Sequence, residues 1–180
     1  LLTRADRGHM DLPRLEEGNV ALQVFSSVTK TPKGQNYDAN DADSDNITPL
    51  VIAQLQPTRT WNSLLERSLW HAEKLDRAAA KASELQVIDT PADIDGLFAR
   101  RKIKGNGIGA LLSIEGLQNL EGDLANLDTL HEAGFRMASL THFFDTDLAG
   151  SMHGVEKGGL TDKGRKAVRR MEELGMVVDI

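Results

Sequence analysis

Apolar runs alternate with amphipathic stretches along most of the chain. Four runs rich in Val, Leu, Ile, Met and Phe are bounded by Gly or polar turn residues, as expected for strands of a parallel sheet. The run at 110–114 is nearly all apolar, which suits a strand buried on both faces. These predicted strands cover residues 20–25, 110–114, 135–140 and 176–180. A shorter run at 85–88 predicts an additional strand.

The amphipathic stretches predict helices. Their apolar residues recur at steps of three and four, which places these residues on one helical face. Each predicted helix has a capping residue at one end or at both. The predicted helices are 61–82 with Ser63 near its start, 91–102 after Thr90, 120–133 before Gly134, and 162–174 between Thr161 and Gly175.

The alternation of strands and helices predicts an α/β fold. Right-handed connections between parallel strands place their carboxyl ends on one face, and the series fits a (β/α)8 TIM barrel. A closed barrel takes about 250 residues, whereas this chain has 180 and stops at Ile180 within a predicted strand. We therefore expect residues 1–180 to form a single partial barrel domain that is incomplete at both ends.

Three successive predicted strands carry a metal-capable side chain at their carboxyl ends. Glu115 directly follows the first of these strands, His142 comes after Thr141 at the end of the second, and Asp179 lies in the third. In a (β/α)8 barrel this face holds the active site, so the three side chains are candidates for one metal or catalytic centre. The alternative is that they are ordinary polar strand ends. Because three occur in consecutive units, both interpretations stay open from spacing alone.

Two acidic motifs resemble metal sites only superficially. His9 and Asp11 form a His-x-Asp pair, but no apolar run precedes it and a Pro-containing turn follows, so a metal site is the less favoured interpretation. The loop at 31–46 carries Asp at 41, 43 and 45, yet Asn46 and Ile52 stand where a calcium loop needs Gly and Glu. We interpret this segment as a solvated loop. A lid over the site is the alternative.

Two further histidines are candidates of lower weight. His71 lies off the apolar stripe of helix 61–82, and we expect it to be exposed. His153 lies in a loop rich in Gly and Asp that follows the strand at 135–140. We expect it to face solvent, and the alternative is that it reaches the site.

Composition excludes several functions. The net charge of −6 argues against nucleic acid or an anionic membrane as partner, and the basic residues at 163–170 fit the solvated face of a helix. Nothing resembles a membrane span or a signal peptide. Because the chain has no cysteine, a metal must be held by His and carboxylate side chains. Cytoplasmic and periplasmic locations both stay open.

Four segments resemble successive blocks of the renal or membrane dipeptidase family of zinc metallopeptidases. They are "HMDLPRLEEGNVALQVFSSV", "LLSIEG", "GFRMASLTH" and "GGLTDKGRKAVRRMEELGMVVDI". They occur in the family's order and span Gly8 to Ile180, with gaps in the loops. The combination of all four is more specific than any one block.

The resemblance implies a (β/α)8 barrel of which this chain supplies about strands two to five. It implies hydrolysis of a dipeptide substrate by a hydroxide that two zinc ions activate. Glu115 matches the carboxylate that bridges both metals, and His142 matches the residue that contacts substrate and stabilises the tetrahedral intermediate. The family's ligating His-x-Asp belongs to an earlier strand, so the resemblance gives no metal role to His9 or Asp11.

The chain also departs from the family pattern. In the family, the strand that corresponds to 176–180 continues to a ligand His. A second ligand His, the catalytic Asp and a substrate-binding Arg lie in later strands of the family. We therefore expect the 180 residues alone to be inactive. "FFDTDLAG" stands after His142 where the family often shows Asn and Trp, which leaves the substrate preference open. A homodimer, a non-catalytic barrel that binds a small ligand or partner, and a metallohydrolase of another amide or lactone are alternatives.

Overall fold

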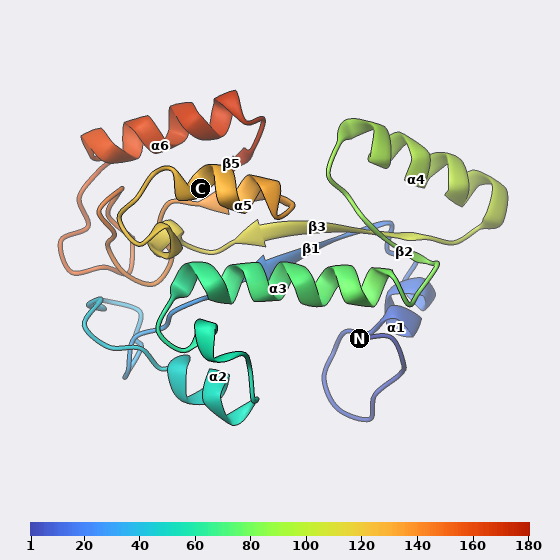
Figure 1. Cartoon of the computed structure of the whole chain (residues 1–180), viewed down its shortest axis with the longest axis horizontal. Helices are drawn as coiled ribbons and strands as arrows, with labels where there is room; N and C mark the ends of the chain where they lie inside the picture. The colour runs from blue at the N-terminus through green and yellow to red at the C-terminus, as the bar shows by residue number, and fades with distance from the viewer.

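The computed structural model describes residues 1–180 as a parallel sheet with helices packed against it (Figure 1). The strands are β1 (Leu22–Ser27), β2 (Leu85–Val87), β3 (Ile108–Ile114), β4 (Phe135–Ser139) and β5 (Val177–Asp179). The α-helices are α1 (Leu12–Glu17), α2 (Thr48–Ala53), α3 (Leu64–Ala79), α4 (Pro91–Lys104), α5 (Asn126–Glu132) and α6 (Asp162–Glu173). Two 3-10 turns are η1 (Thr58–Thr60) and η2 (Leu117–Leu120). No helix has the length and apolar character that crossing a membrane requires.

The main strands follow one another in the sheet in the order β1, β3, β4, β5, and every pair is parallel. The short strand β2 pairs only with residues 108–110 of β3, and β4 pairs with residues 112–114. Since β1 pairs with both of these stretches, β2 and β4 must share the opposite edge of β3. The predicted series of four strands and the separate strand at 85–88 are therefore confirmed.

Local capping explains where most helices begin. The side chain of Ser63 accepts a hydrogen bond from Glu66 N (3.1 Å), and that of Thr161 accepts one from Gly164 N (2.9 Å). Thr90 forms a capping box with Asp93. These hydroxyls satisfy amide groups that the first helical turn leaves without a partner. The three predicted caps are confirmed.

The predicted helix at 120–133 is wrong in its first half. The chain instead forms η2, turns through Glu121 and Gly122 at φ values of 52° and 85°, and begins α5 only at Asn126. The Glu121 carboxylate accepts a hydrogen bond from Leu64 N (2.6 Å) at the start of α3. A contact distant in sequence therefore accompanies a break that the apolar spacing does not reveal.

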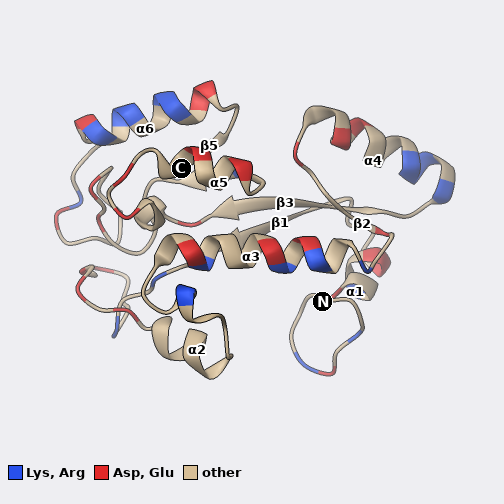
Figure 2. Cartoon of the chain, in the orientation of Figure 1, with Lys and Arg blue, Asp and Glu red and all other residues tan.

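Basic residues recur along α6 (Figure 2), and Arg165, Lys166 and Arg169 are exposed. Lys163 pairs with Asp147, and Arg170 pairs with Asp128 and Glu173. Because ion pairs at exposed positions contribute little to stability, this face acts mainly as a solvated surface. The interpretation of 163–170 as a solvated helical face agrees with the structure.

The two faces of the sheet differ in burial. Side chains of β3 alternate, so Leu112 and Ile114 point toward the helices and Leu111, Ser113 and the following Glu115 point the other way. We call these the outer and inner faces. The outer face forms a buried core with the helices. Its strand and helix members include Leu75, Ile108, Ala110, Leu112, Ile114, Leu127, Leu130, Phe135, Ala138, Ala167 and Met171.

The inner face is largely open. Leu22 and Val24 of β1 are 41% and 37% exposed, and Val177 of β5 is 54% exposed. The register places all three on the face of Ser113, because directly paired residues of parallel strands point the same way. The prediction of burial on both faces, made for the strand at 110–114, holds for β3. The inner faces of β1 and β5 are exposed. No layer within residues 1–180 covers this side of the edge strands.

Candidate functional site

The carboxyl end of the inner face brings the three predicted site residues together. Ser139 pairs with Asp179 in the sheet, and Glu115 directly follows Ile114, which pairs with Ala138. A depression of about 390 Å³ opens above these strand ends. It is lined by Glu115, Ser139, Thr141, His142, Ser151, Met152, His153, Asp179 and Ile180.

Glu115 and His142 touch each other in this depression. His142 Nε2 lies 3.1 Å from Glu115 Oε2, and the side chains are 37% and 31% exposed. Glu115 is held from its backbone, because its N–H donates to Ser27 O (3.1 Å) and Gly116 N donates to Ser139 Oγ (2.9 Å). The pair is therefore fixed to the sheet and still open to solvent.

Gly116 makes the turn after β3 feasible. Its φ is +84°, and a Cβ at this position would lie 2.2 Å from Gln118 Oε1. Any other residue would meet backbone strain, and the end of the Gln118 side chain would have to move aside. This turn aims the Glu115 side chain into the depression and leads into η2.

Ser151 ties the two histidines of the site together. Its buried hydroxyl donates to His142 O (2.6 Å) and accepts from His153 N (3.1 Å). Asp145 fixes the same loop by accepting from Ser151 N and Glu156 N, both at 2.7 Å. Burial opposes ionisation of Asp145, but these backbone hydrogen bonds outweigh it and lower the pKa of the carboxyl group. The loop after β4 is thus organised around an ionised carboxylate.

His153 is half-buried at the rim of the depression, so the expectation that it faces solvent is wrong. Its Nδ1 lies 2.7 Å from Tyr37 O. A carbonyl oxygen can only accept, so Nδ1 carries a proton and Nε2 is left free by this bond. The alternative interpretation, that His153 reaches the site, describes its position correctly.

The loop between β1 and α3 is anchored by Arg67. This guanidinium is 2% exposed and donates to Thr29 O (2.6 Å), Thr60 O (2.8 Å) and Asp45 Oδ2 (2.7 Å). Burial tends to raise the pKa of Asp45, but hydrogen bonds from Thr48 and Arg67 outweigh it and lower that pKa. Asp45 is therefore a structural ion-pair partner and not a solvated loop residue. That the loop closes as a lid stays a prediction.

Asp11 also has a structural task. It is 1% exposed, accepts from Arg14 N (3.0 Å) and Ala5 N (3.1 Å), and pairs with the Arg14 side chain. It is the N-cap of α1, whereas His9 is exposed. These contacts use the Asp11 carboxylate at the start of a helix, away from the depression at the strand ends.

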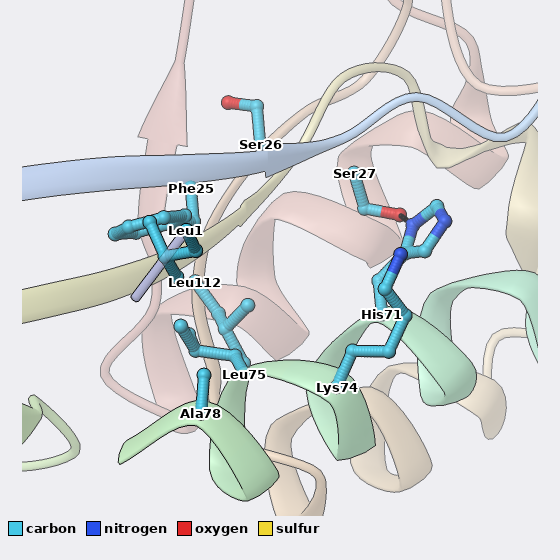
Figure 3. A pocket seen from close by; sticks show the side chains of 9 residues that line it. All are labelled: Leu1, Phe25, Ser26, Ser27, His71, Lys74, Leu75, Ala78 and Leu112. Atoms are coloured by element: carbon cyan, nitrogen blue, oxygen red, sulfur yellow. Dashed lines mark hydrogen bonds between the residues drawn. The ribbon is translucent and has the colours of Figure 1, made fainter. Parts of the chain in front are cut away.

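A separate apolar cavity of about 300 Å³ lies on the outer face, between β1 and α3 (Figure 3). Phe25 and Leu112 point into it, and Ser26 points away. Leu112 and Glu115 differ by an odd number of strand positions, so this cavity and the Glu115 depression lie on opposite faces of the sheet. Chemistry at Glu115 therefore cannot use it.

His71 lines this outer cavity, so the expectation that it is exposed is wrong. Its Nδ1 lies 2.8 Å from Ser27 Oγ (Figure 3). Burial lowers the pKa of His71 to about 4, and the nearby charges of Lys74 and Arg67 act in the same direction. The imidazole is therefore neutral at pH 7.

The described residues hold only part of a metal site. No group of three or more His, Asp or Glu side chains is placed to hold a metal ion. Glu115 is a carboxylate on the inner face at a strand end, a donor type that suits zinc. Glu115 therefore fits as one ligand of a metal site that needs further ligands from other residues.

Some site residues escaped the sequence analysis. Ser139 could have been found, because it lies near the end of a predicted strand, beside the strand that leads to Glu115. Ser151, Asp145 and Tyr37 lie in irregular loops, where no periodicity marks the direction of a side chain.

Comparison with protein families gives one match along nearly the whole chain. The family model described as membrane dipeptidase, peptidase family M19, matches residues 2–180. A dipeptidase of Aspergillus oryzae, aclJ, is 41% identical over 175 residues, which cover 96% of this chain and 36% of that protein. An uncharacterised dipeptidase of Schizosaccharomyces pombe is 29% identical over 179 residues, or 38% of its length. The chain thus spans about two fifths of these relatives.

Solved structures support the fold. A Rhodobacter sphaeroides metallopeptidase, liganded with a phosphinate mimic of the dipeptide L-Ala-D-Ala, aligns with a TM-score of 0.69 and 22% identity. The alignment covers 99% of this chain and 51% of that protein. A metallopeptidase of family M19, dipeptidase AC, aligns with a TM-score of 0.61, 24% identity, and coverage of 97% and 47%. The predicted α/β fold, as part of a TIM-barrel-like domain, is confirmed.

Proposed function

Because this chain belongs to the membrane dipeptidase family, peptidase family M19, we propose that it forms part of a metal-dependent dipeptidase. The reaction is hydrolysis of the peptide bond of a dipeptide to give two amino acids. One observation carries the proposal: Glu115, at the carboxyl end of β3, contacts His142 within an open depression. In barrels this end of the strands holds the active site.

Glu115 is the proposed metal ligand. A carboxylate has two oxygens and can bridge two cations, so it suits a centre with two zinc ions. When bound, such ions activate water and polarise the carbonyl group of the substrate. The remaining ligands would come from residues outside 1–180, since these residues hold no complete set. Residues 1–180 would then be one part of a single barrel domain.

His142 is the proposed catalytic contact with the substrate. Its imidazole lies beside Glu115, and Ser151 and the loop after β4 hold its backbone. A ring N–H placed at the scissile carbonyl can donate to the oxygen as negative charge develops there. The fixed backbone keeps this donor in place before the reaction, so little reorganisation is needed.

The test is Glu115→Gln in the full-length protein. We expect hydrolysis of Ala-Ala to fall by about 10³-fold or more and the metal content per protein to fall with it, because a bridging ligand is lost. Metal is measured by elemental analysis and hydrolysis by release of free amino acids. Glu172→Gln, the same change at an exposed position of α6, should alter neither quantity. A Glu115→Gln variant with full activity and full metal content would sink the proposal.

The same preparation separates related chemistries. Lactones and N-acyl amino acids should be hydrolysed far more slowly than dipeptides. Faster turnover of either class would identify a metallohydrolase of another substrate. A full-length protein that loads metal and cleaves none of these would instead be a binding relative of the family.

A further inference from the structure

A second depression, of about 540 Å³, adjoins the proposed catalytic site. The two depressions share His142 and His153, so a ligand that reaches Glu115 can extend into the second one. The second depression is lined by Gln35, Asn36, Tyr37, His142, Phe143 and His153.

Rings dominate its walls. Tyr37 and His153 meet edge to face, with centroids 4.9 Å apart and planes at 69°. His142 and Phe143 do the same at 4.1 Å and 69°. The other two lining residues have uncharged carboxamide side chains, and no Asp, Glu, Lys or Arg is among the six. The chemistry of the walls therefore suits a planar, uncharged group.

The walls come from two loops that are joined by hydrogen bonds. The loop after β1 supplies Tyr37, and the loop after β4 supplies Phe143 and His153. Asn40, which is 4% exposed, donates to His153 O from both its backbone N (2.8 Å) and its Nδ2 (2.9 Å). His153 Nδ1 donates to Tyr37 O (2.7 Å). These hydrogen bonds hold the His153 ring and the backbone of Tyr37 next to each other without a ligand present.

We propose that this second depression is a specificity subsite that takes an aromatic side chain of the dipeptide substrate, with Tyr37 and His153 as specificity-determining residues. The inference rests on the proposed dipeptidase function. An aromatic ring would be buried against the Tyr37 and Phe143 rings and gain edge-to-face contacts. A charged side chain would lose water without gaining an ionic partner. The carboxamide of Asn36 is engaged within its own loop, where it donates to Ala39 O and accepts from Asp38 N and Ala39 N. The carboxamide of Gln35 can bond a phenol hydroxyl, so Tyr fits as well as Phe.

The experiment compares kcat/KM of the full-length protein for Ala-Ala, Phe-Ala, Ala-Phe, Asp-Ala, Ala-Asp, Lys-Ala and Ala-Lys. We expect kcat/KM with Phe at one of the two positions to exceed kcat/KM with Ala at that position by about tenfold or more. With Asp or Lys at that position, kcat/KM should be lower than with Ala. Tyr37→Ala should reduce the Phe-to-Ala ratio to near one. Tyr37→Phe, which keeps the ring, should preserve the ratio.

A matched control is Phe98→Ala. Phe98 is a half-exposed aromatic residue on α4, away from the carboxyl ends of the strands (Figure 1), so its removal should leave the ratio unchanged. Cleavage of Ala-Ala without any aromatic preference would overturn the subsite and leave the dipeptidase function standing. An unchanged ratio in Tyr37→Ala would also overturn it. If the full-length protein cleaved none of these dipeptides, both proposals would be overturned.

Discussion

The outer and inner faces of the sheet are built for different purposes. On the outer face, Leu112, Phe135 and Ala138 are almost completely buried beneath helices that surround one apolar core. On the inner face, Val24 and Val177 are exposed, and the strand ends carry polar groups around an open depression. The comparison indicates that packing energy comes mainly from one side and the proposed chemistry from the other.

This separation has an energetic basis. Full burial of a Leu or Phe side chain contributes about 1.5–3 kcal/mol, and the outer core joins 20 buried residues. The Glu115–His142 contact is about one-third exposed and adds little to stability, since partly exposed pairs are screened by water. Substitutions on the outer face should therefore lower stability, and substitutions at the inner-face site should lower activity.

The largest effect is expected on the outer face. Phe135 is fully buried, so Phe135→Ala should reduce the free energy of unfolding by about 3–5 kcal/mol through lost burial and a cavity. Val177→Thr on the open inner face should change it by less than about 0.5 kcal/mol. Urea unfolding of the 180-residue chain, followed by circular dichroism, measures both. Equal costs for the two substitutions would break the comparison.

The next effect is on activity. His142→Ala in the full-length protein should lower kcat by about 100-fold, the size of losing one oxyanion donor, which corresponds to about 2.7 kcal/mol of barrier. The free energy of unfolding should stay within about 0.5 kcal/mol of the unaltered protein, because His142 lies at an open site. Steady-state kinetics and thermal unfolding test the two parts. Unchanged kcat would remove His142 from the proposed mechanism.

The smallest expected effect is on the pH dependence of stability. The pKa of His71 is lowered from 6.5 to about 4 in the folded protein, so the unfolded state binds the proton more tightly. Stability from this group is present above about pH 6.5 and is lost as pH falls toward 4. Between pH 7 and pH 5 the loss should be about 2 kcal/mol. His71→Gln should remove this part of the pH dependence, which urea titrations at the two pH values measure. An identical pH dependence in the variant would contradict the burial of His71.

Sequence reasoning succeeded where the determinants are local. The caps at Ser63, Thr90 and Thr161 depend on residues within one helical turn, and each forms as predicted. The strand ends at Glu115 and His142 also follow from local patterns, because parallel strands bring their carboxyl ends to the same edge. Their roles as metal ligand and substrate contact stay predictions.

The errors share a different origin. His71 lies off the apolar stripe of α3, but its ring contacts Ser27 of β1 at the edge of the outer cavity. His153 lies in a loop without periodicity, and hydrogen bonds with Tyr37 and Asn40 bring it to the site. The break before α5 accompanies a contact between Glu121 and the start of α3. In each case the partner is more than forty residues away in the chain.

The sequence by itself determined the order of strands and helices, most helix starts, and the type of side chain at each strand end. These follow from hydrophobic periodicity and from capping bonds within a few residues. Only the tertiary structure decided which face is open, that Arg67 anchors the loop after β1, and that rings from two loops form one depression. Such features depend on which distant segments meet, and the free energy of those contacts is not encoded in any single stretch of chain.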